Sequence, residues 1–378
     1  VQSPIIPVVG GLIRDNPGTI SLGQGVVFYP PPPQAIAALS DFLANPQNHQ
    51  YQSVQGITQL LEIIEIKLRR ENGIKLTDEN AIVVTAGSNM AFMNAILALA
   101  SAGDEIILNT PYYFNHEMAI RMADCQPILV ATDENYHLNP QAIAAAITPK
   151  TRAVVTISPN NPTGAVYGES ELRTVNQICR EKGIYHISDE AYEYFTYDSS
   201  KHFSSGSIPG SGNYTISLYS LSKAYGFASW RIGYMVIPQH LLDAVKKIQD
   251  TILICPPVIS QYAAWGALQS GINYCQSYLA EIAEIRDKIT EELQAIADIA
   301  TVSQAEGAFY FFLKINADID DFELVKTLIE KYHVAVIPGT TFGMRDGCYL
   351  RIAYGASDYP TIKEGIKRLT KGLNITTK

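Results

Sequence analysis

Short, nearly continuous apolar blocks alternate along the chain with segments whose apolar positions recur at helical spacing. The blocks predict buried strands over residues 81–85, 105–109, 153–157, 184–187, 214–219 and 232–237. The helical spacing predicts helices over residues 34–44, 58–72, 88–101, 169–182, 239–254 and 260–270. Because strands alternate with helices, we expect a parallel sheet with helices on its faces, which is an α/β fold.

The two ends of the chain differ from this central pattern. Residues 1–33 lack a clear period and end in the tetraproline 30–33, which predicts an irregular segment. After an amphipathic helix over 277–297, the pattern predicts strands over 309–315, 334–337 and 349–354 and a helix over 321–331. The 378 residues, 47% of them hydrophobic, suffice for one large domain and one smaller domain.

Charge and cysteine content narrow the class of protein. The net charge is −9 and no run is rich in lysine or arginine, which argues against nucleic acid or an anionic membrane as the main partner. The five cysteines are widely spaced and form no C-x-x-C pair, so they indicate neither a disulfide framework nor a metal site. No apolar run has membrane-spanning length and no signal peptide is recognisable, so we expect a cytoplasmic location.

The stretch with the most informative chemistry is S-L-S-K-A-Y-G-F-A-S-W-R-I-G, residues 220–233. It follows a predicted buried strand, which places Lys223 at the edge where open α/β sheets bind ligands. A desolvated lysine amine condenses with carbonyl groups. The hydroxyls of Ser220 and Ser222 and the Arg231 guanidinium suit a phosphate. Taken alone, however, Lys223 also fits an ordinary solvent-exposed loop lysine.

Polar residues also follow two other predicted strands. Asp189 lies just after the predicted strand 184–187, and Tyr192 follows three residues later. A carboxylate buried at this position needs a cation as its partner. A capping aspartate at a strand terminus is the alternative. The residues Ser88 and Asn89 begin a helix after a glycine and so offer an anion site, unless Ser88 is a simple N-cap.

Further candidates lie in turns and on the last predicted strand. Asn161 belongs to S-P-N-N-P-T-G, residues 158–164, whose prolines and glycine define a non-helical turn. Gly25 lets the backbone pass close to a ligand, or simply forms a turn. Tyr113 could stack on a flat ring, with core packing as the alternative for its aromatic neighbours. Arg351 lies among apolar residues and needs an anion, either a substrate carboxylate or a structural salt bridge.

Together these motifs resemble the class I and II aminotransferases, pyridoxal-phosphate enzymes of fold-type I. The resemblance rests on N-N-P-T-G (160–164), D-E-x-Y (189–192), S-x-S-K (220–223), R-x-G (231–233) and R-I-A-Y-G (351–355), in the family's order. It implies a large domain, residues 46–285, with a mostly parallel seven-stranded sheet flanked by helices and one antiparallel strand. It also implies a smaller α+β domain, residues 1–45 and 286–378, and a homodimer with shared active sites.

The resemblance implies a role for each candidate residue. Pyridoxal 5′-phosphate would form a Schiff base with Lys223, Asp189 would face the pyridine nitrogen, and Tyr113 would stack on the ring. The 3′-oxygen would be bound by Tyr192 and Asn161. The phosphate would be held by Ser88, Asn89, Ser220, Ser222, Arg231 and, from the neighbouring subunit, Tyr51. The substrate carboxylate would be held by Gly25, Asn161 and Arg351.

The expected activity is transamination between an L-amino acid and a 2-oxo acid, with no metal ion. The apolar run at residues 26–29 predicts a pocket for apolar or aromatic side chains, whereas Arg14 is a candidate for binding a distal carboxylate. Within the same fold, the alternative is a carbon–sulfur β-lyase that uses the same cofactor. An alternative of a different class is a non-catalytic regulator that binds pyridoxal phosphate, which would carry an additional DNA-binding domain.

Overall fold

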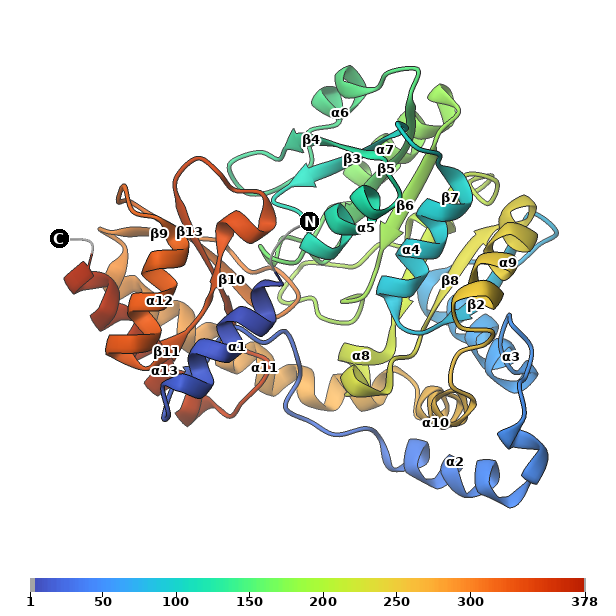
Figure 1. Cartoon of the computed structure of the whole chain (residues 1–378), viewed down its shortest axis with the longest axis horizontal. Helices are drawn as coiled ribbons and strands as arrows, with labels where there is room; N and C mark the ends of the chain where they lie inside the picture. Colours follow the sequence, from blue (N-terminus) through green and yellow to red (C-terminus); the bar gives the residue numbers. More distant parts are fainter. Residues whose placement is uncertain (1–3, 377–378) are drawn as a thin grey trace.

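A seven-stranded sheet forms the centre of the larger part of the molecule (Figure 1). In spatial order its strands are β2 (Asn80–Thr85), β8 (Gly233–Pro238), β7 (Thr215–Ser220), β6 (Tyr185–Asp189), β5 (Thr151–Ile157), β3 (Glu105–Thr110) and β4 (Gln126–Ala131). Neighbouring strands are parallel except where β8 pairs with β2 and β7. This computed structural model, which describes residues 4–376, thus confirms the predicted sheet and its antiparallel strand.

Helices cover both faces of this sheet, so its central strands are buried on both sides. The helices of this part are α3 (Thr58–Lys67), α4 (Ser88–Leu99), α5 (Phe114–Met122), α6 (Pro140–Ala146), α7 (Glu169–Lys182), α8 (Leu221–Ala224), α9 (Leu242–Ile252) and α10 (Val258–Gln269). Apolar residues of α4, α5 and α9 form one core with the sheet, and those of α6 and α7 form another on the opposite face. Burial on both faces explains why the sequence shows continuous apolar runs rather than alternation.

The smaller part contains a four-stranded sheet and a two-stranded one. The four-stranded sheet has the order β12 (Ile337–Pro338), β13 (Cys348–Ala353), β10 (Tyr310–Ile315) and β9 (Ala300–Val302), and β1 (Ile20–Ser21) pairs with β11 (Val334–Ala335). The predicted strand 334–337 is therefore two short strands in two different sheets. The other helices are α1 (Ile5–Asp15), α2 (Pro33–Ala44), α11 (Ile272–Leu293), α12 (Asp321–Tyr332) and α13 (Tyr359–Thr376).

Helix α11 runs from the larger part into the smaller part (Figure 1). It begins at Ile272, five residues before the predicted start, and its apolar face contributes Ile282, Ile285 and Ile289 to the largest core. Helix α2 packs along α10. The division into residues 46–285 and residues 1–45 with 286–378 stays a prediction.

The expectation that residues 1–33 are irregular is wrong, because α1 spans Ile5–Asp15. Pro7 lies in the first turn of α1, where a missing backbone N–H breaks no helical hydrogen bond. The apolar residues Ile5, Val9 and Leu12 recur at helical spacing and pack into the core of the smaller part. Tertiary burial of this face outweighs the two glycines inside the helix, which weaken its intrinsic propensity.

Between Pro4 and Thr376, no helix combines the length and the apolar character that crossing a lipid bilayer requires. All five cysteines are buried and none is disulfide-bonded.

Candidate active site

The residues that the sequence singled out converge on one cavity of about 400 Å³ at the carboxyl ends of β5, β6 and β7. Its lining includes Gly25, Ser88, Asn89, Tyr113, Asn161, Asp189, Tyr192, Ser220, Ser222, Lys223, Arg231 and Arg351. Of the predicted site residues, only Tyr51 lies elsewhere. Parallel strands bring residues that are distant in the chain to the same edge, so the position matches that of ligand sites in α/β proteins.

Lys223 reaches the cavity from α8, a single helical turn directly after β7. The Ser220 hydroxyl accepts a hydrogen bond from the Ser222 amide (3.1 Å) and caps this turn. At the other end, the Tyr29 hydroxyl donates to the Lys223 carbonyl oxygen (3.0 Å). The Lys223 ammonium donates to the carbonyl oxygen of Gly25. The lysine is therefore a fixed group inside the cavity and not a solvent-exposed loop residue.

The surroundings of Lys223 favour its neutral amine. Removal from water, together with the positive charges of Arg351 and Arg231, lowers the pKa of Lys223 to about 8. An amine with a pKa near 8 is neutral in about a tenth of the molecules at pH 7, far more often than an ordinary lysine, so it can act as a nucleophile or accept a proton.

Asp189 is held by two groups on either side of its carboxylate. Its Oδ1 accepts a hydrogen bond from the Ala191 amide (3.1 Å), as a capping aspartate would. Its Oδ2 lies 3.0 Å from Nε2 of His116, which is buried and stacks on the ring of Phe92 at 3.9 Å. The sequence analysis missed His116, which lies in the first turn of α5, because its contact with Asp189 joins residues that are distant in the chain.

Two tyrosine hydroxyls meet inside the cavity. The hydroxyls of Tyr192 and Tyr310 are 2.5 Å apart, and both side chains are buried. Burial raises the pKa of Tyr192 far above its usual value and the pKa of Tyr310 to about 12, so both remain protonated at neutral pH. Tyr310 was also missed, because only the tertiary structure shows that the first residue of β10 faces the cavity.

Arg351 is a buried cation, 3% exposed, whose partners are neutral. One terminal nitrogen donates to Asn161 Oδ1 (2.9 Å) and the other donates to the Gly23 carbonyl oxygen (2.6 Å). Its guanidinium carbon lies 4.6 Å from the centre of the Tyr310 ring and 5.0 Å from that of Phe342. Within residues 4–376 no carboxylate pairs with it, so the alternative of a structural salt bridge is excluded. The site is prepared for an external anion.

A second group of donors forms the opposite end of the cavity. Helix α4 begins at Ser88, and its N-cap is Gly87, so the alternative that Ser88 is a simple N-cap is excluded. The Arg231 guanidinium packs over Gly87, where a side chain would collide with it. The amide groups at the start of α4, nearby hydroxyls and this guanidinium therefore converge, as an anion site requires.

An apolar wall closes part of the cavity. Ile6 of α1 lines it together with Val26 and Phe114. The guanidinium of Arg14 instead lies near the backbone of its own helix at Gly10 and Gly11 and does not line the cavity. Arg14, the candidate for binding a distal carboxylate of the substrate, is therefore absent from this wall.

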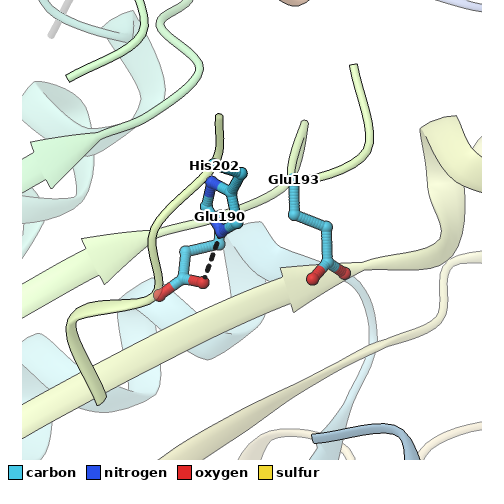
Figure 2. Close-up of side chains that lie close together, drawn as sticks. All are labelled: Glu190, Glu193 and His202. Atoms are coloured by element: carbon cyan, nitrogen blue, oxygen red, sulfur yellow. Dashed lines mark hydrogen bonds and ion pairs between the residues drawn. The ribbon is translucent and has the colours of Figure 1, made fainter. Parts of the chain in front are cut away.

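Glu190, Glu193 and His202 form another cluster of titratable groups next to the turn that carries Asp189 and Tyr192 (Figure 2). Glu190 Oε2 lies 2.9 Å from His202 Nε2, whereas Glu193 Oε2 lies 2.5 Å from the Lys67 ammonium. Burial alone would raise the pKa of Glu190, but hydrogen bonds from His202 and Ser204 lower it below its usual value. Lys67 supplies the cation here, so this cluster is a structural ion-pair network behind the cavity.

The fold and the residues of the cavity indicate an enzyme that binds a cofactor with an aldehyde and a phosphate. The comparison of this sequence with known protein families supports that conclusion. The profile of the family described as aminotransferase class I and II matches residues 17–369, so the chain belongs to this family. Its members are pyridoxal-phosphate-dependent, and the chain is accordingly an aminotransferase that exchanges an amino group between amino acids and 2-oxo acids. The lyase alternative is not favoured, and a non-catalytic regulator is not supported.

The chain is also similar to individual aminotransferases of known sequence or structure. The chain is 33% identical over 379 residues to the aromatic aminotransferase ISS1 of Arabidopsis thaliana, covering 98% of this chain and 93% of the relative. It is 34% identical to a probable aspartate/prephenate aminotransferase of Aquifex aeolicus, covering 86% of this chain and 83% of that one. An aspartate aminotransferase structure from Thermus thermophilus, a double mutant, superimposes with a TM-score of 0.90 at 29% identity, covering 98% and 97%. The aromatic aminotransferase structure from Pyrococcus horikoshii gives 0.89 at 29%, covering 97% and 99%.

Proposed function

We propose that this aminotransferase binds pyridoxal 5′-phosphate through the cavity residues named above and prefers amino acids with apolar or aromatic side chains. The main support for cofactor binding is the arrangement of Lys223, Asp189 and Arg351 around one cavity of about 400 Å³. A partly neutral amine, a buried carboxylate and an unpaired guanidinium match the aldehyde of the cofactor, its pyridine nitrogen and the substrate carboxylate, respectively.

The remaining cavity residues fit the other parts of the cofactor. The donors at the start of α4, with Ser220, Ser222 and Arg231, are suited to its phosphate. Tyr113 offers an aromatic face for its ring, and the Tyr192 hydroxyl and the Asn161 amide are suited to its 3′-oxygen. The aldehyde, the pyridine nitrogen, the 3′-oxygen, the ring face and the phosphate of the cofactor therefore each have a suitable side chain in the cavity.

The side chains of this protein then have distinct tasks. Pyridoxal 5′-phosphate supplies an aldehyde that condenses with amines and a ring that withdraws electrons. Arg351 and Asn161 bind the carboxylate of the amino acid and so orient it. Lys223, with its pKa near 8, accepts the proton from Cα of the amino acid and returns a proton later. Asp189 presents its carboxyl group to the cavity, because the Ala191 amide donates to Oδ1 and His116 Nε2 lies 3.0 Å from Oδ2.

The proposed preference for apolar substrates rests on the wall of Ile6, Val26 and Phe114. Among the described residues, no third arginine lines the cavity besides Arg231 and Arg351, and Arg14 lies elsewhere. A distal carboxylate at this wall would lose its hydration without gaining a partner, which is costly. Relatives named as aromatic aminotransferases are consistent with this preference, although others are named for aspartate.

We also propose a cytoplasmic homodimer in which Tyr51 completes the partner's phosphate site. Tyr51 is 78% exposed and lies in a surface hollow that also includes Phe42 and Ile259. A large exposed aromatic residue among apolar neighbours is typical of a protein–protein contact. Asn89 and Arg231, which line the open end of the cavity, are exposed as well, so that end is accessible to a second subunit.

A screen of amino donors with one common 2-oxo acid acceptor tests the function and the preference together. We expect Phe, Tyr, Met or Leu to exceed Asp and Glu in kcat/KM, because the wall around Ile6 cannot compensate a second carboxylate. Aspartate or glutamate outpacing them by about tenfold, or about 1.4 kcal/mol, would refute the preference. Release of pyruvate and ammonia without exchange would instead indicate a lyase. Lys223→Ala should abolish the visible band that arises from the Schiff base between Lys223 and the cofactor.

A further inference from the structure

Tyr310 lines the cavity and contacts Tyr192, Arg351 and Gly25, although the proposed function gives it no role. Its hydroxyl lies 2.5 Å from the Tyr192 hydroxyl, and its ring carries the Arg351 guanidinium at 4.6 Å. Its hydroxyl also packs so closely against the Gly25 backbone that a Cβ atom at Gly25 would overlap it. Gly25 in turn accepts the hydrogen bond of the Lys223 ammonium. A single side chain thus contacts the groups proposed for the cofactor oxygen and the substrate carboxylate, and it packs against the residue that binds the Lys223 amine.

The distance between the two hydroxyls determines how their protons can be shared. An O···O separation of 2.5 Å is at the short end for hydrogen bonds between hydroxyl groups. Each tyrosine has one proton, so one hydroxyl donates and the other accepts. If Tyr192 donates its proton to an anionic oxygen in the cavity, its own oxygen can accept only from Tyr310. Two donors in series polarise one another, which makes the terminal donor stronger.

Hydrogen-bond arrangements in which Tyr310 does not donate to Tyr192 are energetically less favourable. Among the described residues, the Tyr310 hydroxyl forms its hydrogen bond with Tyr192 alone, and both side chains are buried. If Tyr310 donated elsewhere, the buried Tyr192 oxygen would lose its donor. The Arg351 cation above the ring makes the phenol a better hydrogen-bond donor, since it withdraws electron density from the ring.

We propose that Tyr310 is a positioning and tuning residue of the transamination site, donating a hydrogen bond to Tyr192 and so strengthening the bond that Tyr192 makes to an anionic cofactor oxygen. This inference rests on the proposed function. The hydroxyl and the ring have separate tasks. The hydroxyl acts through Tyr192, and the ring holds Arg351 in place for the substrate carboxylate.

Two substitutions separate the tasks in the holoenzyme. Tyr310→Phe removes the hydroxyl and keeps the ring, whereas Tyr310→Leu removes both. The readout is the pH midpoint of the visible absorbance change of the bound cofactor, measured without substrate. Losing the donor to Tyr192 should raise this midpoint by about 0.5 to 1 unit, because one hydrogen bond to the deprotonated form is weakened. Tyr349→Phe, at a buried tyrosine that lines a different hollow, is the matched control and should leave the midpoint unchanged.

Steady-state kinetics test the task of the ring. Tyr310→Phe should keep the KM of the amino donor within about twofold, while Tyr310→Leu should raise it about tenfold or more, because the cation–π contact of Arg351 is lost. In a Tyr192→Phe background, Tyr310→Phe should shift the pH midpoint by no more than about 0.2 unit, since the hydroxyl acts through Tyr192.

The outcomes distinguish this inference from the proposed function. A wild-type protein without a visible cofactor band or without amino-group exchange would overturn both. A normal wild-type protein whose midpoint does not move in Tyr310→Phe, or moves equally with and without the Tyr192 hydroxyl, would overturn the role of Tyr310 alone.

Discussion

Replacing Lys67 by methionine should destabilise the protein far more than removal of a surface lysine, because the ion pair of Lys67 is buried behind the active-site turn. Lys67 and Glu193 are 6% and 9% exposed, and the ammonium lies 2.5 Å from Glu193 Oε2. It also donates to Asn72 Oδ1 (2.8 Å) and lies 4.7 Å from the centre of the Tyr219 ring. In Lys67→Met, the Glu193 carboxylate would keep, among the described residues, only its hydrogen bond from the Asn72 amide, at 2.7 Å.

The expected loss can be given a magnitude. Removing one partner of a buried ion pair leaves an uncompensated charge and typically costs about 3 to 5 kcal/mol. The double variant Lys67→Met/Glu193→Met removes both charges and keeps apolar volume, so its loss should be less than about half of that. Lys247→Met is the control, since the Lys247–Asp250 pair has a similar N···O distance of 2.8 Å but its lysine is 75% exposed. Its loss should stay below about 1 kcal/mol.

Equilibrium urea unfolding at one fixed protein concentration, followed by far-UV circular dichroism, measures these losses. Glu193 belongs to the same turn as Asp189 and Tyr192, so Lys67→Met should also lower the affinity for pyridoxal 5′-phosphate. Equal losses in Lys67→Met and Lys247→Met would refute the reasoning. A double variant that is as unstable as Lys67→Met would refute it as well, because the penalty would then not come from an unpaired Glu193.

Two further predictions concern His186 and Gly25. Burial lowers the pKa of His186 from 6.5 to about 4, so the unfolded chain binds a proton that the folded protein does not between these values. The free energy of unfolding should therefore fall by about 3 kcal/mol as the pH drops from 6.5 to 4. In His186→Asn, the urea midpoint should depend less on pH over this range. An unchanged pH dependence in this variant would contradict the prediction. Gly25→Ala should lower kcat/KM at least about tenfold with a near-native thermal midpoint, because its Cβ would displace the Tyr310 hydroxyl; full activity would show that the contact is dispensable.

The sequence by itself determined the elements whose signals are local. Helix α7 was predicted with its observed bounds, since Glu171 accepts from the Gly168 amide at its start (2.7 Å) and Gly183 ends it with a positive φ of 66°. Strands β6 and β7 were recognisable because burial on both faces requires continuous apolar residues. Strand β4 was missed because it is an edge strand whose only buried residue is Val130, so no such run exists.

Some residues of the candidate site could likewise be predicted from the sequence, whereas others could not. Lys223 and Asp189 were predictable because each follows its own strand within a short motif, and parallel strands bring such ends together. His116 and Tyr310 were not, because their importance lies in contacts with residues 73 and 118 positions away in the chain. The absence of a carboxylate beside Arg351, within residues 4–376, was likewise decided only by packing. Local patterns encode which elements form, whereas the partners of a buried group depend on how distant elements pack together.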